Sequence, residues 1–263
     1  MGIYYQQEDG EFLDYGMAQL HGEWFRGPLD QGPDAIAWLG AAQTFGRYVA
    51  EPVPAIVGKR LGLGTLNLGV GGMGPEYFLR RPELLEEVNR CRVAVIQVMS
   101  ARNSENSLFQ SHKGGASGVR VDSGTYTPNA MLIVTDLLAQ GRRREAGQIA
   151  RESQQAYVQS MKRLFDAVKP PKVLFWFSYR TPPPAIKGYR RMVDVFPHMV
   201  SRRMLSQIRR SADGYVAVSS RVGIPQIIRD DAGKEIAVNK YYPSPEMHQL
   251  AADPLTRALQ SLL

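Results

Sequence analysis

The stretch IAWLGAAQTFGRYV, residues 36–49, decides the fold that we predict for this chain. Its apolar start, residues 36–39, predicts a buried strand, the small residues 40–42 predict a tight turn, and residues 43–50 predict a helix. A strand, a cramped turn and a helix N-terminus direct backbone N–H groups toward one point, which suits an anion or an oxyanion. The same geometry presents a nucleophile in some enzymes. Here Ala42 stands at that position, and a methyl group cannot attack a substrate.

The composition of the 263 residues is that of an ordinary globular protein, with 44% hydrophobic and 22% charged residues. It excludes a disordered or fibrous chain, and no apolar run approaches the roughly 20 residues of a membrane span. The polar N-terminal stretch has no secretion signal, and the single cysteine, Cys91, has no partner for an internal disulfide. We therefore expect a cytoplasmic protein without a membrane partner. The four histidines stand too far apart for a zinc site, so neither a metal nor another cofactor is the leading expectation.

The net charge of +7 comes largely from clustered arginines. Because no aromatic residues are interleaved among them and no nucleic-acid motif accompanies them, the clusters indicate solvated helix faces rather than a nucleic-acid partner. A further interpretation is that some of these arginines attract a small anionic substrate. The clusters lie at residues 142–144, 190–191, 202–203 and 209–210.

Apolar runs alternate with helical patterns along most of the chain. This alternation predicts one α/β domain over residues 35–263, with three layers, a mainly parallel central sheet and a flavodoxin-like layout. Residues 1–34 have no clean period and predict an irregular N-terminal arm laid over the core. Pro52 and Pro54 are expected to stop the first helix. We expect further strands at residues 64–70, 92–99, 172–178 and 214–218, a hairpin at 227–238, a long polar loop at 100–128, and helices at 75–89 (kinked or split by Pro82), 130–140, 144–168, within 193–210 and at the C-terminal end.

Ligands of such sheets bind beyond the carboxyl ends of the strands. The loops expected there are residues 40–46, 69–74, 100–106 and 178–184, which are rich in Gly, Ser, Asn and Arg. Arg102 and Arg180 each stand two residues after a serine that ends a strand. Both are predicted to reach into the cleft and bind a carboxylate, phosphate or sulfate, the alternative being an ion pair with a loop acid. His21, His112 and His198 have no supporting context.

Four blocks of the sequence resemble those of the SGNH/GDSL hydrolases. The first, residues 40–46, matches Gly-Asp-Ser-x-Thr-x-Gly at Gly40, Thr44 and Gly46, but has Ala41 for the Asp and Ala42 for the nucleophilic Ser. The other three blocks are NLGVGG (67–72), SARN (100–103) after a hydrophobic strand, and PEMH (245–248) before the last helix. The strings GAAQTFGR, NLGVGGMGP, VMSARNSEN and YYPSPEMH also resemble an uncharacterised bacterial family with an SGNH-like layout.

The resemblance implies acyl chemistry in which a serine attacks an ester and a histidine takes its proton. Carried over, the oxyanion cradle consists of the Ala42 N–H, a glycine N–H such as that of Gly71, and the side chain of Asn103. His248 is then the base, with Glu246 as its orienting partner. Gln43, Thr44, Arg102 and Arg180 are the expected substrate contacts, and Ser100 is a candidate replacement for the missing nucleophile.

Several functions remain open at this point. The leading hypothesis is acyl or related group transfer or hydrolysis on a polar, anionic substrate such as a charged carbohydrate, through Ser100, through water activated by His248, or by direct transfer between two bound substrates. The second is a non-catalytic module that binds a ligand in the retained cradle. The third is a nucleotide-dependent enzyme. Residues 69–74 satisfy G-x-G-x-x-G, and Ser100 with Arg102 could hold the 2′-phosphate of NADP or a phosphorylated group donor. A glycine-rich turn used only for close packing is the alternative to that motif.

Overall fold

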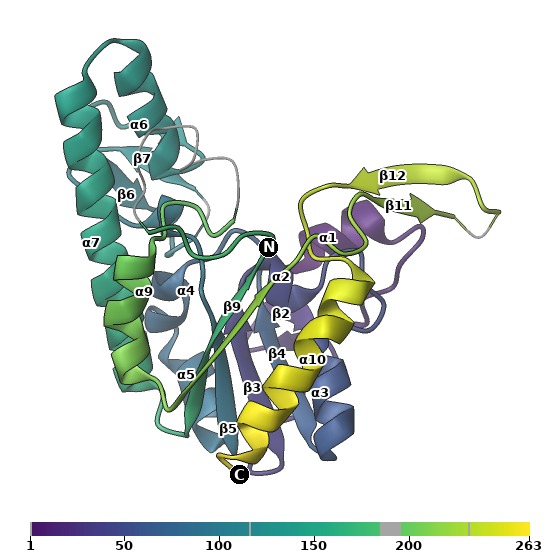
Figure 1. The fold of residues 1–263 in the computed structure, drawn as a ribbon. Coiled ribbons are helices and arrows are strands. Elements are labelled where there is room, and N and C mark those ends of the chain that lie inside the picture. The colour runs from purple at the N-terminus through teal and green to yellow at the C-terminus, as the bar shows by residue number, and fades with distance from the viewer. Residues whose placement is uncertain (1, 116, 185–195, 231) are drawn as a thin grey trace.

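The computed structural model describes residues 2–115, 117–184, 196–230 and 232–263. Its centre is a five-stranded sheet with the strand order β10-β9-β5-β3-β4, in which all neighbouring strands are parallel (Figure 1). The strands are β3 (Ala35–Gly40), β4 (Gly64–Gly69), β5 (Val93–Gln97), β9 (Lys172–Ser178) and β10 (Gly214–Ser219). The order and direction of these strands confirm the predicted α/β fold class.

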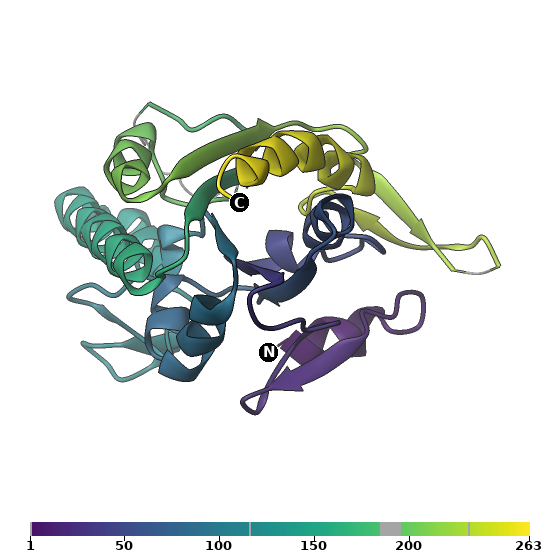
Figure 2. The ribbon, with the colours of Figure 1, turned by 90° about the horizontal axis from the view of Figure 1, so that it is seen from below.

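Helices cover both faces of this sheet, which gives the molecule three layers (Figure 2). On one face α3 (Val53–Leu61) and α10 (Pro245–Gln260) pack over a core that includes Trp38 and Phe175. The opposite core includes Leu39 and Trp176. Its helices are α4 (Pro75–Leu79), α5 (Pro82–Arg90), α6 (Ala130–Ala139), α7 (Arg143–Ala167) and α9 (Arg202–Ile208), which is followed by the 3₁₀ turn η2 (Arg209–Ser211). Because β3, β5 and β9 are buried on both faces, their sequences are continuous apolar runs.

The prolines near residue 50 have a different role from the predicted one. The helix after β3, α2 (Ala42–Phe45), is a single turn, because Gly46 adopts a left-handed conformation with φ 79° and ends it. Pro52 is the N-cap of α3 and Pro54 lies in its first turn, so these residues begin a helix rather than stop one. Pro82 likewise begins α5 and splits the predicted helix into α4 and α5.

The segment 1–34 is not irregular, which corrects the prediction. It forms α1 (Gly2–Asp9) and a hairpin of β1 (Met17–Leu20) and β2 (Glu23–Arg26). These elements are short, and their aromatic residues are buried individually, among them Tyr5, Tyr15 and Phe25. Since no single face repeats along the segment, hydrophobic periodicity gives no signal for it.

The polar stretch after β5 also contains more structure than a loop. It holds the 3₁₀ turn η1 (Ala101–Asn103) and a small antiparallel sheet of β6 (Phe109–Ser111), β7 (Gly118–Arg120) and β8 (Tyr126–Thr127). The predicted hairpin near the C-terminus is confirmed as β11 (Gln226–Arg229) and β12 (Glu235–Asn239), which project from the body of the molecule (Figure 1). Of the helix predicted within residues 193–210, residues 193–195 lie outside the described part of the chain. Within the described residues, no helix combines the length and the apolar character needed to span a bilayer.

The turn that opens α2 is fixed by buried polar contacts from neighbouring strands. The side-chain oxygen of Gln97 accepts hydrogen bonds from the Ala41 N–H (2.9 Å) and the Thr44 hydroxyl (2.6 Å). Asn67 Nδ2 donates to the Thr44 carbonyl at 3.2 Å. A Cβ atom added to Gly69 would lie 2.3 Å from the Phe45 nitrogen, so only glycine lets β4 and α2 approach this closely.

Replacement of Gly69 by alanine is therefore expected to lower the free energy of unfolding by about 2–3 kcal/mol, the cost of forcing extra volume against backbone in a packed core. Chemical denaturation of the purified variant measures this change. Gly147→Ala is the matched control, because Gly147 lies inside α7 with its nearest neighbour at 3.4 Å. That substitution should raise stability by about 0.5–1 kcal/mol. Equal stability of the Gly69 variant and the wild type would contradict the close approach.

Candidate functional site

A pocket opens at the carboxyl edge of the sheet, above α2. We call it the Ser100 pocket, and it encloses about 330 Å³ of empty space. It brings together four residues singled out from the sequence: Ala42, Gln43, Ser100 and Arg102. They come from the turns after β3 and β5, neighbours in the sheet whose carboxyl ends meet. The other lining residues are Tyr5, Ala41, Gly72, Met73, Phe196, Tyr241 and Tyr242.

Ser100 forms a hydrogen-bonded pair with His198, a histidine without supporting context in the sequence. Its Oγ lies 2.9 Å from His198 Nδ1 and accepts the backbone N–H of His198 at 3.0 Å. The Ser100 hydroxyl can donate to Nδ1 or to the His198 carbonyl oxygen, which lies 3.4 Å away, and we assign its hydrogen to the nearer Nδ1. The ring proton of His198 is then on Nε2, which lies 3.4 Å from the Tyr241 hydroxyl. Ser100 and His198 are 5% and 3% exposed.

The charges around this pair keep the histidine neutral. Burial, followed by the positive charges of Arg102 and Arg180, lowers the pKa of His198 to about 3. Burial also raises the pKa of Tyr241 to about 12, although Arg102 opposes that shift. At neutral pH the His198 ring is therefore uncharged, and Tyr241 keeps its hydroxyl hydrogen.

The two arginines predicted to bind an anion differ in their surroundings. Arg102 lines the Ser100 pocket, and its buried Nε has no hydrogen-bond partner within the described residues. No ion pair of Arg102 occurs in that part of the chain either. Arg180 instead donates from Nη2 to the Pro197 carbonyl at 2.9 Å and does not line the pocket. Arg102 is thus the cation available to a ligand, whereas Arg180 supports the loop that carries His198.

The rest of the predicted oxyanion cradle is engaged in packing. Asn103 Nδ2 donates to the Gly72 carbonyl, and the Asn103 side chain does not line the pocket. Gly71 is covered by Tyr5, because a Cβ atom at this position would lie 2.1 Å from the Tyr5 hydroxyl oxygen. Thr44 is turned inward toward Gln97. Of Ala42, Gly71 and Asn103, only Ala42 lines the pocket, together with Gly72 from the same glycine loop.

His248 and Glu246 do not form a catalytic pair in this structure. His248 is fully buried, and its Nδ1 accepts the Val53 N–H at 2.9 Å, which leaves the ring proton on a buried Nε2. Glu246 is exposed and lies beside Gly223, where an added Cβ would be 2.1 Å from its carboxylate. Neither residue lines the Ser100 pocket. The contacts of His248 indicate a structural link between α10 and α3.

The glycine-rich loop 69–74 is also used for packing. Gly69 lies against the backbone of α2, and Gly71 lies against Tyr5. These close approaches support the interpretation that the G-x-G-x-x-G pattern serves packing. They offer no support for a dinucleotide site. Within the residues that the structure describes, no group of three His, Cys, Asp or Glu side chains is placed to hold a metal ion.

The two buried histidines predict how stability depends on pH. An unperturbed histidine titrates near pH 6.5, whereas the pKa of His198 and that of His248 are each lowered to about 3 by burial. Between these values the unfolded chain binds more protons, so the free energy of unfolding falls as the pH falls below about 6.5. Each histidine contributes about 1.4 kcal/mol per pH unit to this slope. Above about pH 6.5 the contribution of the two histidines to the free energy of unfolding no longer changes with pH.

Urea denaturation between pH 7 and 5 measures this slope. The variants His198→Asn and His248→Asn should each remove one histidine's share, while a variant of the exposed His112 leaves it unchanged. An identical slope in the His248 variant would show that this residue is solvated in the folded protein.

A family model described as "Domain of unknown function (DUF6473)" matches residues 3–114 and 130–263. The unmatched residues 115–129 fall on β7, β8 and the turn between them. No curated protein matches the chain.

Several solved structures are similar at low identity. An acetylxylan esterase from Geobacillus stearothermophilus, in a catalytic-mutant form, is 15% identical with a TM-score of 0.42, over 88% of this chain and 96% of that one. A two-domain esterase active on acetylated mannans is 15% identical with a TM-score of 0.45, over 88% of this chain and 50% of that one. A protein described as lipolytic, of the G-D-S-L family, from Desulfitobacterium hafniense DCB-2 is 12% identical with a TM-score of 0.43, over 86% of this chain and 99% of that one.

Proposed function

The chain belongs to the family of the domain of unknown function DUF6473, and from its own site we propose that it hydrolyses or transfers the acyl group of a polar, anionic ester. Ser100 is the nucleophile in this proposal, His198 is its base, and Arg102 holds the anionic group of the substrate. The observation that carries the proposal is the pair of hydrogen bonds on Ser100 Oγ, to His198 Nδ1 and from the His198 N–H, on the wall of a pocket.

The geometry of this pair supports nucleophilic attack. Ser100 Oγ attacks the ester carbonyl carbon while its proton passes to His198 Nδ1. The carbon–oxygen bond to the alcohol breaks, and the departing oxygen takes the proton from Nδ1. Water or a second alcohol then attacks the acyl-serine, gives its proton to Nδ1, and Oγ regains that proton as the acyl group leaves. The backbone N–H of His198 stabilises negative charge on Oγ, and Tyr241 orients the ring through Nε2.

Arg102 links substrate binding to the strength of the base. Its positive charge is one of the causes of the low pKa of His198. An anionic group bound to Arg102 offsets that charge and raises the pKa of His198 toward its usual value, which makes Nδ1 a stronger proton acceptor. An anionic ester therefore activates the site that cleaves it, whereas a neutral ester does not.

Covalent trapping tests the proposal. We would incubate the protein with two p-nitrophenyl esters, the neutral acetate and the anionic half-ester of succinic acid, and analyse the digest by mass spectrometry. We expect the succinyl group on the peptide that contains Ser100, and none in the Ser100→Ala variant. Ser104→Ala is the matched control, because Ser104 is also buried in the same loop and is 6% exposed.

A second candidate function is binding without reaction, and Ala42 favours it, because the turn that presents a nucleophile in the resembled hydrolases carries a methyl group here. In that case calorimetry shows that succinate binds in the Ser100 pocket beside Arg102, but no acyl group appears on Ser100 with either ester. This pair of results would contradict the proposed chemistry and assign the pocket to ligand binding.

A further inference from the structure

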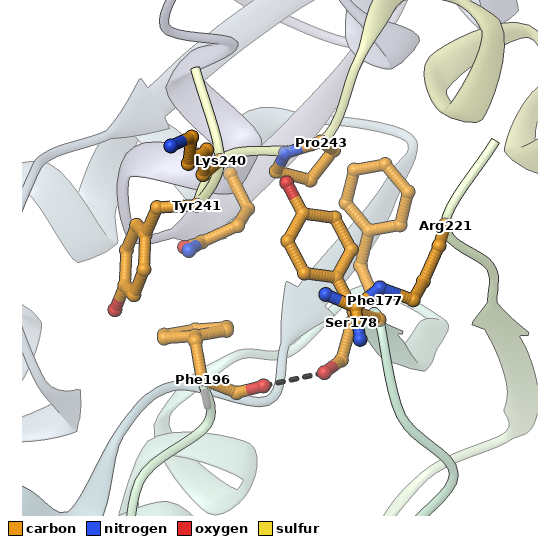
Figure 3. A pocket seen from close by; sticks show the side chains of 9 residues that line it. Phe177, Ser178, Phe196, Arg221, Lys240, Tyr241 and Pro243 are labelled. Carbon is orange, nitrogen blue, oxygen red and sulfur yellow. Dashed lines mark hydrogen bonds between the residues drawn. The ribbon is translucent and has the colours of Figure 1, made fainter. Parts of the chain in front are cut away.

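A second pocket, shown in Figure 3, shares lining residues with the Ser100 pocket. We call it the Arg221 pocket, and its open space, which includes the solvent at its mouth, is about 440 Å³. Gln43, Phe196 and Tyr241 line both pockets, so these three side chains form the partition between them. The residues that belong to the Arg221 pocket alone are Phe177, Ser178, Tyr179, Arg221, Lys240 and Pro243.

The inner walls of the Arg221 pocket are aromatic and fixed in place. Phe177 is fully buried, and its ring stacks on Phe175 at a centroid distance of 4.9 Å. The ring of His248 packs edge to face against Phe177 at a centroid distance of 5.0 Å. Tyr179 donates its hydroxyl hydrogen to the Tyr242 carbonyl. Phe177 thus forms a rigid backing, and the half-buried Tyr179, held by its own hydrogen bond, presents a preformed apolar surface to a flat ligand.

The rim of the pocket carries two positive charges without matching negative ones. Arg221 and Lys240 are exposed, and within the described residues neither forms an ion pair or a side-chain hydrogen bond. The Arg221 guanidinium lies 5.9 Å from the centre of the Tyr179 ring. Among the described residues, no acidic side chain lines the pocket. Two uncompensated cations at the mouth of an apolar pocket attract an anion and hold it at the rim.

We propose that the Arg221 pocket binds a ligand that combines a planar ring with a phosphate or carboxylate group, the ring resting against Tyr179 and the anionic group lying between Arg221 and Lys240. Binding in this pocket does not depend on chemistry at Ser100. The partition nevertheless places such a ligand beside the proposed nucleophile. If the proposed function holds, a hydroxyl group of this ligand is positioned to accept the acyl group in place of water, which makes the reaction a transfer.

Calorimetric titration of the full-length protein with four probes tests the binding. Adenosine 5′-monophosphate and phenyl phosphate carry both a ring and an anionic group, adenosine lacks the anion, and inorganic phosphate lacks the ring. We expect at least one of the first two probes to bind at least tenfold more tightly than adenosine or phosphate. Tighter binding of the nucleotide than of phenyl phosphate assigns the pocket to nucleotides, and the reverse assigns it to simple aryl anions. Equal affinity for inorganic phosphate, or for adenosine, would overturn the proposal.

A pair of variants separates the rim from the overall charge of the protein. The double variant Arg221→Gln/Lys240→Gln should lose at least tenfold in affinity for the better of the two ring-bearing anions. Its control, Arg209→Gln/Lys234→Gln, removes the same charge from exposed positions outside the pocket, and Arg209 also lies over a tyrosine ring, that of Tyr215, at 4.5 Å. Unchanged affinity in the first double variant, or equal losses in both, would refute the assignment.

A third variant keeps this test separate from the proposed reaction. Ser100→Ala should bind the ring-bearing anion with unchanged affinity, because Ser100 does not line the Arg221 pocket. Retained binding together with absent acylation removes the proposed reaction and leaves the binding site. Loss of binding in Ser100→Ala alone would instead show that the ligand occupies the Ser100 pocket, which contradicts the proposal.

Discussion

Replacement of Ser100 by alanine is expected to lower kcat for an anionic ester by about 10³-fold or more, since a serine–histidine site that loses its nucleophile retains only binding and charge stabilisation. The substitution removes the Oγ that lies 2.9 Å from His198 Nδ1. It also leaves the His198 N–H without its acceptor, so the folded state should be confirmed by circular dichroism. Steady-state hydrolysis of the p-nitrophenyl succinate half-ester provides the rate.

Two further variants show whether Ser100 and His198 act as one unit. His198→Asn should lose activity to a similar extent, and the double variant should be no less active than either single one, because groups that act together are not additive. His248→Asn should retain activity, because its amide oxygen still accepts the Val53 N–H and the residue does not line the pocket. If Ser100→Ala keeps more than a tenth of the wild-type kcat, another group is the nucleophile.

Replacement of Arg102 by methionine is expected to lower kcat/KM for the anionic half-ester by about 10²-fold, close to 3 kcal/mol, the usual cost of removing a charged partner from a desolvated anion. The neutral acetate should lose much less, because it makes no ion pair. Arg102 has no ion-pair partner within the described residues, so methionine, which has a similar length, leaves no charge unpaired in the free protein. Arg203→Met on the exposed face of α9 is the control.

The pH profile gives a second readout of the same substitution. Arg102 lowers the pKa of His198, so its removal raises that pKa. Because the base acts in its neutral form, the acidic limb of kcat/KM should move to higher pH in Arg102→Met. The Arg102→Lys variant keeps a charge at the end of a flexible chain and should leave this limb close to its wild-type position. Equal losses for the anionic and the neutral ester would remove Arg102 from substrate recognition.

The sequence predicted the central sheet because its strands carry their own signal. The β-branched run that forms β5 and the aromatic run of β9 are apolar on both faces, which only a buried parallel strand requires. The same topology rule predicts that Ser100 and Arg102 lie at the carboxyl edge of the sheet. The sequence predicts a helix at residues 43–50, but neither the single-turn length of α2 nor the hairpin of residues 17–26 has a comparable signal, since a glycine turn and tertiary contacts rather than periodicity determine them.

His198 shows most clearly what a single sequence leaves out. It lies 98 residues from Ser100, on a loop without a recognisable motif, and the packing of that loop against η1, where the Ala101 N–H donates to the His198 carbonyl, brings the two side chains together. His248 had the more familiar spacing, but the Val53 N–H occupies its Nδ1. Motif position thus predicted which loops meet at one edge of the sheet, whereas the pairing of side chains depended on contacts between distant segments.

Tyr5 packs against Gly71 and lines the Ser100 pocket, but it is not one of the groups proposed to react. Tyr5 belongs to α1, which lies outside the central sheet and carries none of the proposed reacting groups. Its ring nevertheless forms part of the pocket wall. Arg47 holds this helix in place through Asp9 and Glu8. Changes at the amino-terminal end of the chain can therefore alter the size of the molecule that enters, while the reacting atoms stay as they are. A new substrate range needs no change in the chemistry.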